Sequence, residues 1–193
     1  MRIVSPTSRA FILAFVVFLF SPSRPAQDAS LPVSKVRALR LVRVSSLPGW
    51  REEVSNEGRF RVLFPCGPEI SADVISVKEL KCTYAGVSWQ VSYSELPRAV
   101  LSDEFKQRYH QANRAIATDG RHLIVERDVF LNGRLGSETV TTRQSHATYM
   151  RSFISGTRLY VVSVSQKASA DLRDRIPRDI QNFFDSFVYW DKL

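Results

Sequence analysis

Cys66 and Cys82 are the residues best suited to covalent chemistry in this 193-residue chain, and they are its only cysteines. An even number of cysteines in an exported chain indicates a disulfide. The loop closed by this bond would contain about 15 residues, for which chain entropy gives about 3 kcal/mol of stabilisation. A metal-binding or redox pair is the weaker interpretation, because the spacing is not C-x-x-C. Free thiols at two strand positions are the remaining alternative.

The three histidines lie at unrelated spacings and predict no metal site. His122 falls opposite Arg143 if the chain folds back at Asn132-Gly133, which is an unfavourable neighbour for a metal ion. His110 lies on the polar side of an expected helix, and His146 begins an expected strand. No carboxylate or thiol stands at ligand spacing from any of them. We therefore expect neither a metal ion nor another cofactor.

Paired carboxylates are the side chains that general acid–base catalysis uses most often after histidine. The pairs in this chain are Asp103/Glu104, Glu126/Asp128 and Asp171/Asp174. Glu126 and Asp128 share one face of a strand, but their apolar neighbours favour a solvated or ion-paired strand. Nucleophile-elbow, zinc-protease, phosphate-loop and dinucleotide-binding motifs are all absent from the sequence. We predict no catalytic residue, with a hydrolase or lyase using an unrecognised polar cluster as the alternative.

The N-terminus has the pattern of a secretory signal peptide. A charged start with Arg2 and Arg9 precedes an apolar run over residues 10–20, and Ser21-Pro22-Ser23 follows. The run is about half as long as the roughly 20 residues of a membrane-spanning helix. We predict a signal peptide over residues 1–23 and a secreted or periplasmic protein, with an uncleaved anchor as the alternative.

The formal net charge of +8 would fall to +6 on loss of residues 1–23. The basic residues are scattered among acids, and this distribution predicts a solvated surface rather than a nucleic-acid site. Export also argues against a nucleic-acid partner. A basic run from Lys35 to Arg43 would suit a short helix lying on an anionic membrane. Its periodicity is poor, so residues 24–49 are better interpreted as a flexible or loosely docked linker.

Residues 121–165 carry the clearest pattern of secondary structure. Asn132-Gly133 predicts a hairpin, because both central residues of a type I′ turn need positive φ. Folding there sets Val125 opposite Val140 and Arg127 opposite Glu138. A second turn at Ser155-Gly156 would set Tyr149 opposite Val162 and Met150 opposite Val161. The stretch therefore predicts a four-stranded antiparallel meander.

The rest of the chain supplies further strands and two helices. Strands are expected over residues 59–64, 70–82 and 87–93, where apolar residues alternate with polar ones. Helical spacing of apolar residues predicts helices over 101–117 and 170–187, the second kinked or restarted at Pro177. We predict a single α+β domain over residues 50–193, with about seven antiparallel strands and two main helices packed on the sheet.

Several of these segments resemble small exported bacterial proteins with a PsbP-like fold. Residues 57–65 are similar to the opening G-x-F-x-V-x-F-P pattern of that family. The resemblance continues through 87–93, Asn132-Gly133, 156–161 and 183–187. It implies an α/β/α sandwich and a binding or assembly role, and it supplies no catalytic residue to carry over. Cys66 and Cys82 are not part of the family pattern.

We therefore expect an exported, non-catalytic binding or assembly module. Its partner would be a protein or a small ligand in the cell envelope. One sheet face or the loops around Asn132-Gly133 would make the contact. Contact with an anionic membrane through residues 35–43 is a further alternative.

Overall fold

The computed structural model describes residues 37–38, 48–71, 77–96, 104, 120–168 and 176–190. The predicted signal peptide, most of the predicted linker and the predicted helix over 101–117 lie outside them, apart from Glu104, which is helical. In the described part of the chain, no helix is long and apolar enough to cross a membrane.

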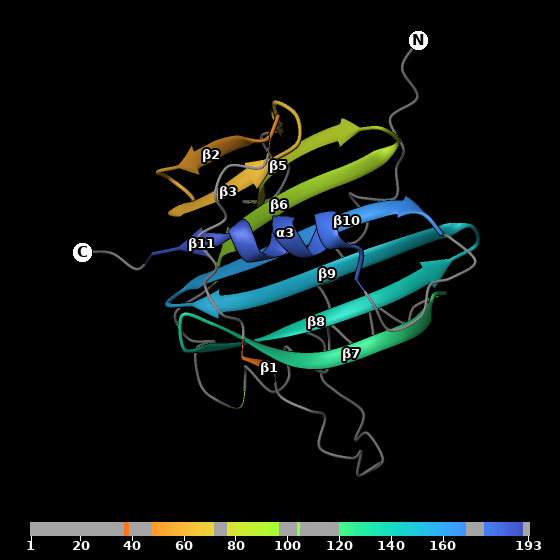
Figure 1. The fold of residues 1–193 in the computed structure, drawn as a ribbon. Helices are drawn as coiled ribbons and strands as arrows, with labels where there is room; N and C mark the ends of the chain where they lie inside the picture. The colour runs from red at the N-terminus through yellow and green to blue at the C-terminus, as the bar shows by residue number, and fades with distance from the viewer. Residues whose placement is uncertain are drawn as a thin grey trace.

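Most described residues form one eight-stranded sheet (Figure 1). Its strands are β1 Arg37–Ala38, β4 Glu69–Ser71, β5 Val77–Tyr84, β6 Val87–Glu95, β7 His122–Leu131, β8 Arg134–Arg143, β9 His146–Ser155 and β10 Arg158–Lys167. Their order across the sheet is β1-β7-β8-β9-β10-β6-β5-β4, and every neighbouring pair is antiparallel except β1 with β7. The predicted antiparallel sheet is confirmed, with a short parallel strand added at one edge.

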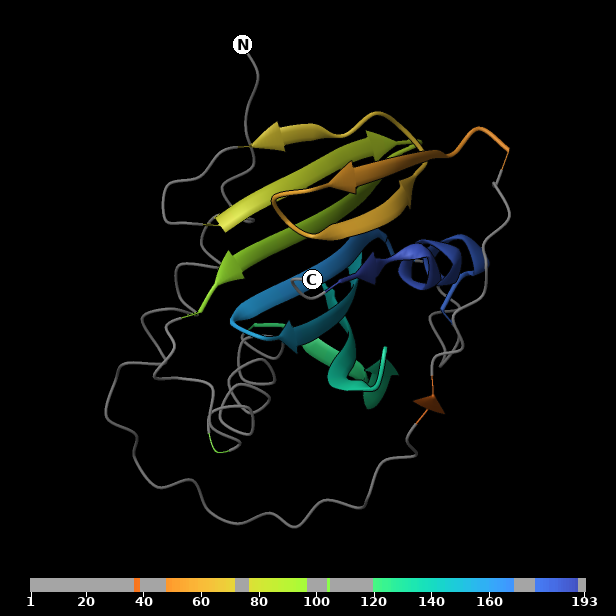
Figure 2. The same ribbon diagram turned by 90° about the vertical axis from the view of Figure 1, so that its left-hand side faces the viewer.

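A second, three-stranded sheet has the order β11-β3-β2. It contains β2 Arg51–Ser55, β3 Phe60–Phe64 and β11 Val188–Tyr189. The prediction that 59–64 belongs to the main sheet is therefore wrong. Figure 2 shows this small sheet in front of the β5–β6 end of the large one. The side chains of Phe60, Val62 and Phe64 are buried, so the predicted apolar face of this strand is confirmed.

The hairpin at Asn132-Gly133 forms as predicted, with φ of 51° and 73° at its two central residues. Val125 pairs with Val140, and Arg127 pairs with Glu138. The predicted pairing of His122 is wrong, because a register shift between Leu123 and Val125 places it opposite Thr142. A β-bulge of this kind adds one residue to one strand and cannot be foreseen from turn position.

The second turn of the meander differs from the prediction by one residue. Its central residues are Gly156-Thr157, because Ser155 pairs with Arg158. Tyr149 therefore lies opposite Val164, and Met150 lies opposite Ser163. The prediction of a single strand over residues 70–82 is also wrong. Ile70 lies on β4 and Leu80 on β5, and the two residues pair with each other across these antiparallel strands.

Helix α3, Arg178–Ser186, begins directly after Pro177. Proline fixes φ and lacks an N–H, so it suits a helix start and not a helix interior. The predicted restart at Pro177 is confirmed, while residues 169–175 lie outside the described chain. The hydroxyl of Ser186 accepts a hydrogen bond from Leu63 N at 3.0 Å and thereby joins the helix end to β3.

An aromatic layer fills the space between the large sheet, the small sheet and α3. Phe183 of the helix lies 5.3 Å from both Phe64 and Trp89 between ring centroids. Phe187 contacts Phe60 at 5.5 Å and Tyr160 at 5.6 Å. These contacts join three elements into one core, and the face of the large sheet that they cover is called the core face below.

The opposite face of the large sheet is rich in serine and threonine, and we call it the hydroxyl face. Ser137 and Ser152 face each other across β8 and β9 with their hydroxyl oxygens 2.8 Å apart. The buried members of this face are Ser92, Ser137, Thr139, Thr141 and Ser152. The hydrogen bond between Ser137 and Ser152 lets these two hydroxyls be buried with a partner.

Candidate functional site

The described core contains a row of charged side chains across three strands. Glu138 on β8 lies between Arg127 on β7 and Arg151 on β9 and is directly paired with each. Both arginines form ion pairs with the Glu138 carboxylate, and the bond from Arg151 Nε measures 2.6 Å. Glu138 is 0% exposed and Arg151 is 1% exposed. A buried carboxylate is stable only with such partners, because desolvation of an unpaired charge is costly.

Helix α3 completes this network from above the sheet. Asp185 accepts hydrogen bonds from Arg151 Nη1 at 3.0 Å and from Gln181 Nε2 at 2.7 Å. The Arg151 guanidinium also lies 4.7 Å from the ring centre of Phe184. The two contacts of Arg151 join β9 to α3, so the cluster holds the helix in place on the core face. The sequence missed this role of Arg151, although a charged residue alternating with Tyr149 and Phe153 was an available signal.

A second cluster joins the small sheet to the large one. Arg158 donates to the Glu95 carboxylate through Nε at 2.7 Å and to the Glu57 carbonyl through Nη1 at 2.7 Å. Burial would raise the pKa of Glu95, but hydrogen bonds from Thr157 and Arg158 outweigh it and hold the pKa below its ordinary value. The hydroxyl of Tyr160 donates to the Gly58 carbonyl at 2.9 Å. These bonds fix the β2–β3 turn against β10.

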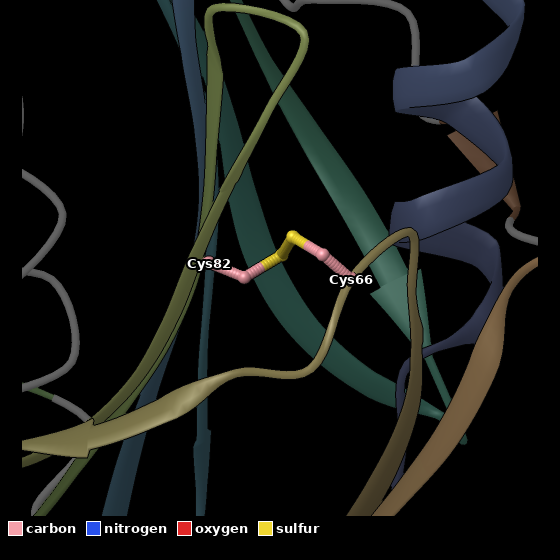
Figure 3. The surroundings of a disulfide bond; sticks show 2 residues. All are labelled: Cys66 and Cys82. Atoms are coloured by element: carbon pink, nitrogen blue, oxygen red, sulfur yellow. A yellow bond between two sulfur atoms is a disulfide. The ribbon is translucent and has the colours of Figure 1, made fainter.

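The predicted disulfide between Cys66 and Cys82 is confirmed, with the two Cα atoms 6.0 Å apart. Figure 3 shows it bridging β5 and the connection that leads from β3 to β4. The bond therefore links the small sheet to the large one at a point where Cys82 is buried beside Trp89, its cross-strand neighbour. The metal and free-thiol alternatives for this pair are excluded by the bond.

The remaining candidate residues that the structure describes do not come together in one site. His122 and His146 are exposed at the ends of their strands, and Glu126 is exposed while Asp128 is half-buried. His110, Asp103, Asp171 and Asp174 lie outside the described residues. Within the described ranges, no group of three or more histidines, cysteines and carboxylates could hold a metal ion.

The region around the Asn132-Gly133 turn has apolar side chains on the hydroxyl face. Leu135, which is 44% exposed, pairs with Phe130, and Ile154 pairs with Leu159 on the next two strands. Strand alternation puts all four on one face at the same end of the sheet. We call them the apolar row: Phe130, Leu135, Ile154 and Leu159.

The turn beside the apolar row is fixed to the rest of the fold. The Asn132 amide donates to the Tyr189 carbonyl at 3.2 Å, and the Tyr189 hydroxyl donates to the Leu131 carbonyl at 3.1 Å. Both bonds join the hairpin to β11 of the small sheet. Leu135 is therefore an exposed apolar side chain on a well-supported backbone, which suits a preformed contact surface.

Comparison with known proteins identifies the fold. The structure resembles the solution structure of cyanobacterial PsbP, CyanoP, from Synechocystis, with a TM-score of 0.53 and 12% sequence identity over 77% of this chain and 97% of that chain. A Bacteroides thetaiotaomicron structure matches with a TM-score of 0.40 and 8% identity over 75% of this chain and 50% of that chain. No protein-family model matches the chain, and no curated protein does. The fold is thus PsbP-like, as the sequence resemblance implied.

Proposed function

We propose that this chain is an exported, non-catalytic binding or assembly module that contacts a protein partner through the apolar row. The observation that carries the proposal is the 44% exposure of Leu135, which lies beside the half-buried Phe130 and Ile154 and the buried Leu159 on a polar sheet face. Contiguous apolar surface with a polar rim is typical of a protein-interaction site. Export is supported by the disulfide and by the PsbP-like fold.

The polar groups of the described core support a binding role over a catalytic one. Glu138 already accepts ion pairs from two arginines, and Asp185 accepts from Arg151 and Gln181. A general acid or base must reach a substrate proton at hydrogen-bond distance. The carboxylates of Glu138 and Asp185 instead form ion pairs and hydrogen bonds that hold α3 and three strands together.

The test is affinity capture from envelope extract with the tagged full chain and two variants. Leu135→Thr removes the most exposed member of the apolar row and keeps a residue that favours strands. Ile70→Thr is the matched control, because Ile70 is a 74% exposed strand residue on β4. We expect a stoichiometric protein to be captured by the wild type and by Ile70→Thr, and to be lost with Leu135→Thr. Equal capture by all three chains would show that the apolar row is not the contact surface.

A further inference from the structure

The end of the large sheet farthest from the Asn132-Gly133 turn carries a row of basic side chains. Arg143 on β8 pairs with His146 on β9, and His146 pairs with Lys167 on β10. All three are exposed, and strand alternation places them on the hydroxyl face. The turn between β8 and β9 and the end of β10 lie at the right of Figure 1. We call this region the basic end.

Arg121, which precedes β7, adds a further cation to the basic end. Its Nη1 donates to the Thr148 hydroxyl at 3.3 Å, and Thr148 lies 3.1 Å from the Ser165 hydroxyl oxygen. Burial lowers the pKa of Arg121, and the nearby charge of Arg143 lowers it further. The effect of Arg143 on this pKa indicates that the two guanidinium groups are near enough to interact electrostatically.

In the described parts of the chain, no ion pair involves Arg143, His146 or Lys167. Some other cations of the same sheets have carboxylate partners, namely Arg61, Lys78, Arg127, Arg151 and Arg158, whereas Arg51 and Lys81 form no ion pair among the described residues. Like charges on neighbouring strands disfavour the fold slightly. Because these basic side chains have no carboxylate partner among the described residues, they are suited to bind an anion from outside the chain.

We propose that the basic end binds the anionic headgroups of a lipid bilayer. Neighbouring strands are about 4.8 Å apart, so the backbones of Arg143 and Lys167 are separated by about 10 Å and the row extends across three strands. A bilayer presents many phosphates at adjustable positions, which suits such a spread row. On β7–β10 the one large apolar side chain that is exposed is Leu135, at the opposite end. The basic end thus lacks the apolar anchor of a protein-binding hot spot.

This proposal does not rest on the apolar row or on residues 35–43. The test measures co-sedimentation of the full chain with phosphatidylcholine vesicles, with and without phosphatidylglycerol, at low and high salt. The variant Arg143→Gln/Lys167→Gln removes two cations from the basic end. The control Arg51→Gln/Arg178→Gln removes two exposed cations that lie on β2 and at the start of α3. Both variants have the same net charge and keep residues 35–43.

Each cation near an anionic surface strengthens binding about fivefold, so the double variant should bind the phosphatidylglycerol vesicles about 25-fold more weakly. The control should bind like the wild type, and high salt should weaken both. Equal binding by variant and control would overturn the proposal. So would displacement of the wild type by soluble glycerol phosphate, which would identify a soluble phosphate ligand instead. Thermal unfolding of all three chains checks that each is folded.

Discussion

Glu138 and Arg151 lie directly opposite each other on β8 and β9, and both side chains are almost completely buried. A pair of this kind contributes little net stability over a well-packed apolar pair, but removal of one partner leaves the other buried charge with less compensation. Glu138 would keep its ion pair with Arg127, and Arg151 would keep its ion pair with Asp185 of α3.

Glu138→Gln should lower the free energy of unfolding by about 2 kcal/mol, because it removes the buried carboxylate that Arg127 and Arg151 share while Asp185 still pairs with Arg151. Denaturant unfolding followed by circular dichroism measures the change. Glu69→Gln is the matched control, since Glu69 is exposed on an edge strand, and it should change stability by less than about 0.5 kcal/mol. A loss no larger than that of the control would show that the network does not hold the helix.

Glu95 should make the protein less stable in acid. Its pKa is below the ordinary value in the folded chain, so the unfolded chain binds this proton at a higher pH. The stabilisation is therefore complete above the unfolded pKa of about 4.3 and is lost as the pH falls through the lower folded value. Because the side chain is 55% exposed, we expect an effect of at most about 1 kcal/mol. Glu95→Gln should show a correspondingly smaller loss of stability between about pH 5 and about pH 3.

Reduction of the Cys66–Cys82 bond should lower the free energy of unfolding by about 3 kcal/mol, since it restores the freedom of the loop in the unfolded chain. The measurement compares denaturant midpoints with and without a reductant. A Cys66→Ala/Cys82→Ala variant provides the control, because it should be as unstable as the reduced wild type and should not respond to reductant. A denaturant midpoint of the wild type that does not change with reductant would contradict a stabilising disulfide.

Gly136→Ala should destabilise the large sheet by about 1–3 kcal/mol through overpacking. Gly136 lies opposite Phe153, and an added Cβ would overlap both that ring and the Ser152 carbonyl oxygen. Gly67→Ala is the matched control, because an added Cβ at Gly67 meets no atom within 4 Å. Thermal unfolding of the two variants should therefore differ by several degrees. Similar unfolding temperatures would mean that the sheet adjusts to the extra atom.

The sequence predicted the parts of the fold that depend on local pattern. Alternation of apolar residues identified the core strands, and Asn132-Gly133 set the first hairpin because positive φ at two consecutive residues is seldom tolerated elsewhere. Pro177 set the start of α3 through its missing N–H. In each case the physical constraint lies within a few residues of the feature that it determines.

The sequence did not predict features that depend on distant contacts. The polar strand β2 can be recognised only through its pairing with β3. The separate small sheet forms because Phe60 and Phe64 face α3 and the large sheet. The bulge after Leu123 adds one residue without a sequence signal. The alternation of Arg151 with Tyr149 and Phe153 places it on the core face, but its contact with Asp185 depends on α3, which is distant in the sequence.

The strands β7, β8, β9 and β10 each contain ten residues and span the molecule from the apolar row to the basic end. The apolar row and the basic end are eight residues apart on β8, β9 and β10, so at about 3.3 Å per residue the two surfaces are separated by about 26 Å. A partner bound at the apolar row would then be separated from the lipid headgroups at the basic end by a distance comparable to the thickness of a bilayer core. Both contacts could be made at once, and lengthening the four strands together would move the partner away from the lipid without altering either surface.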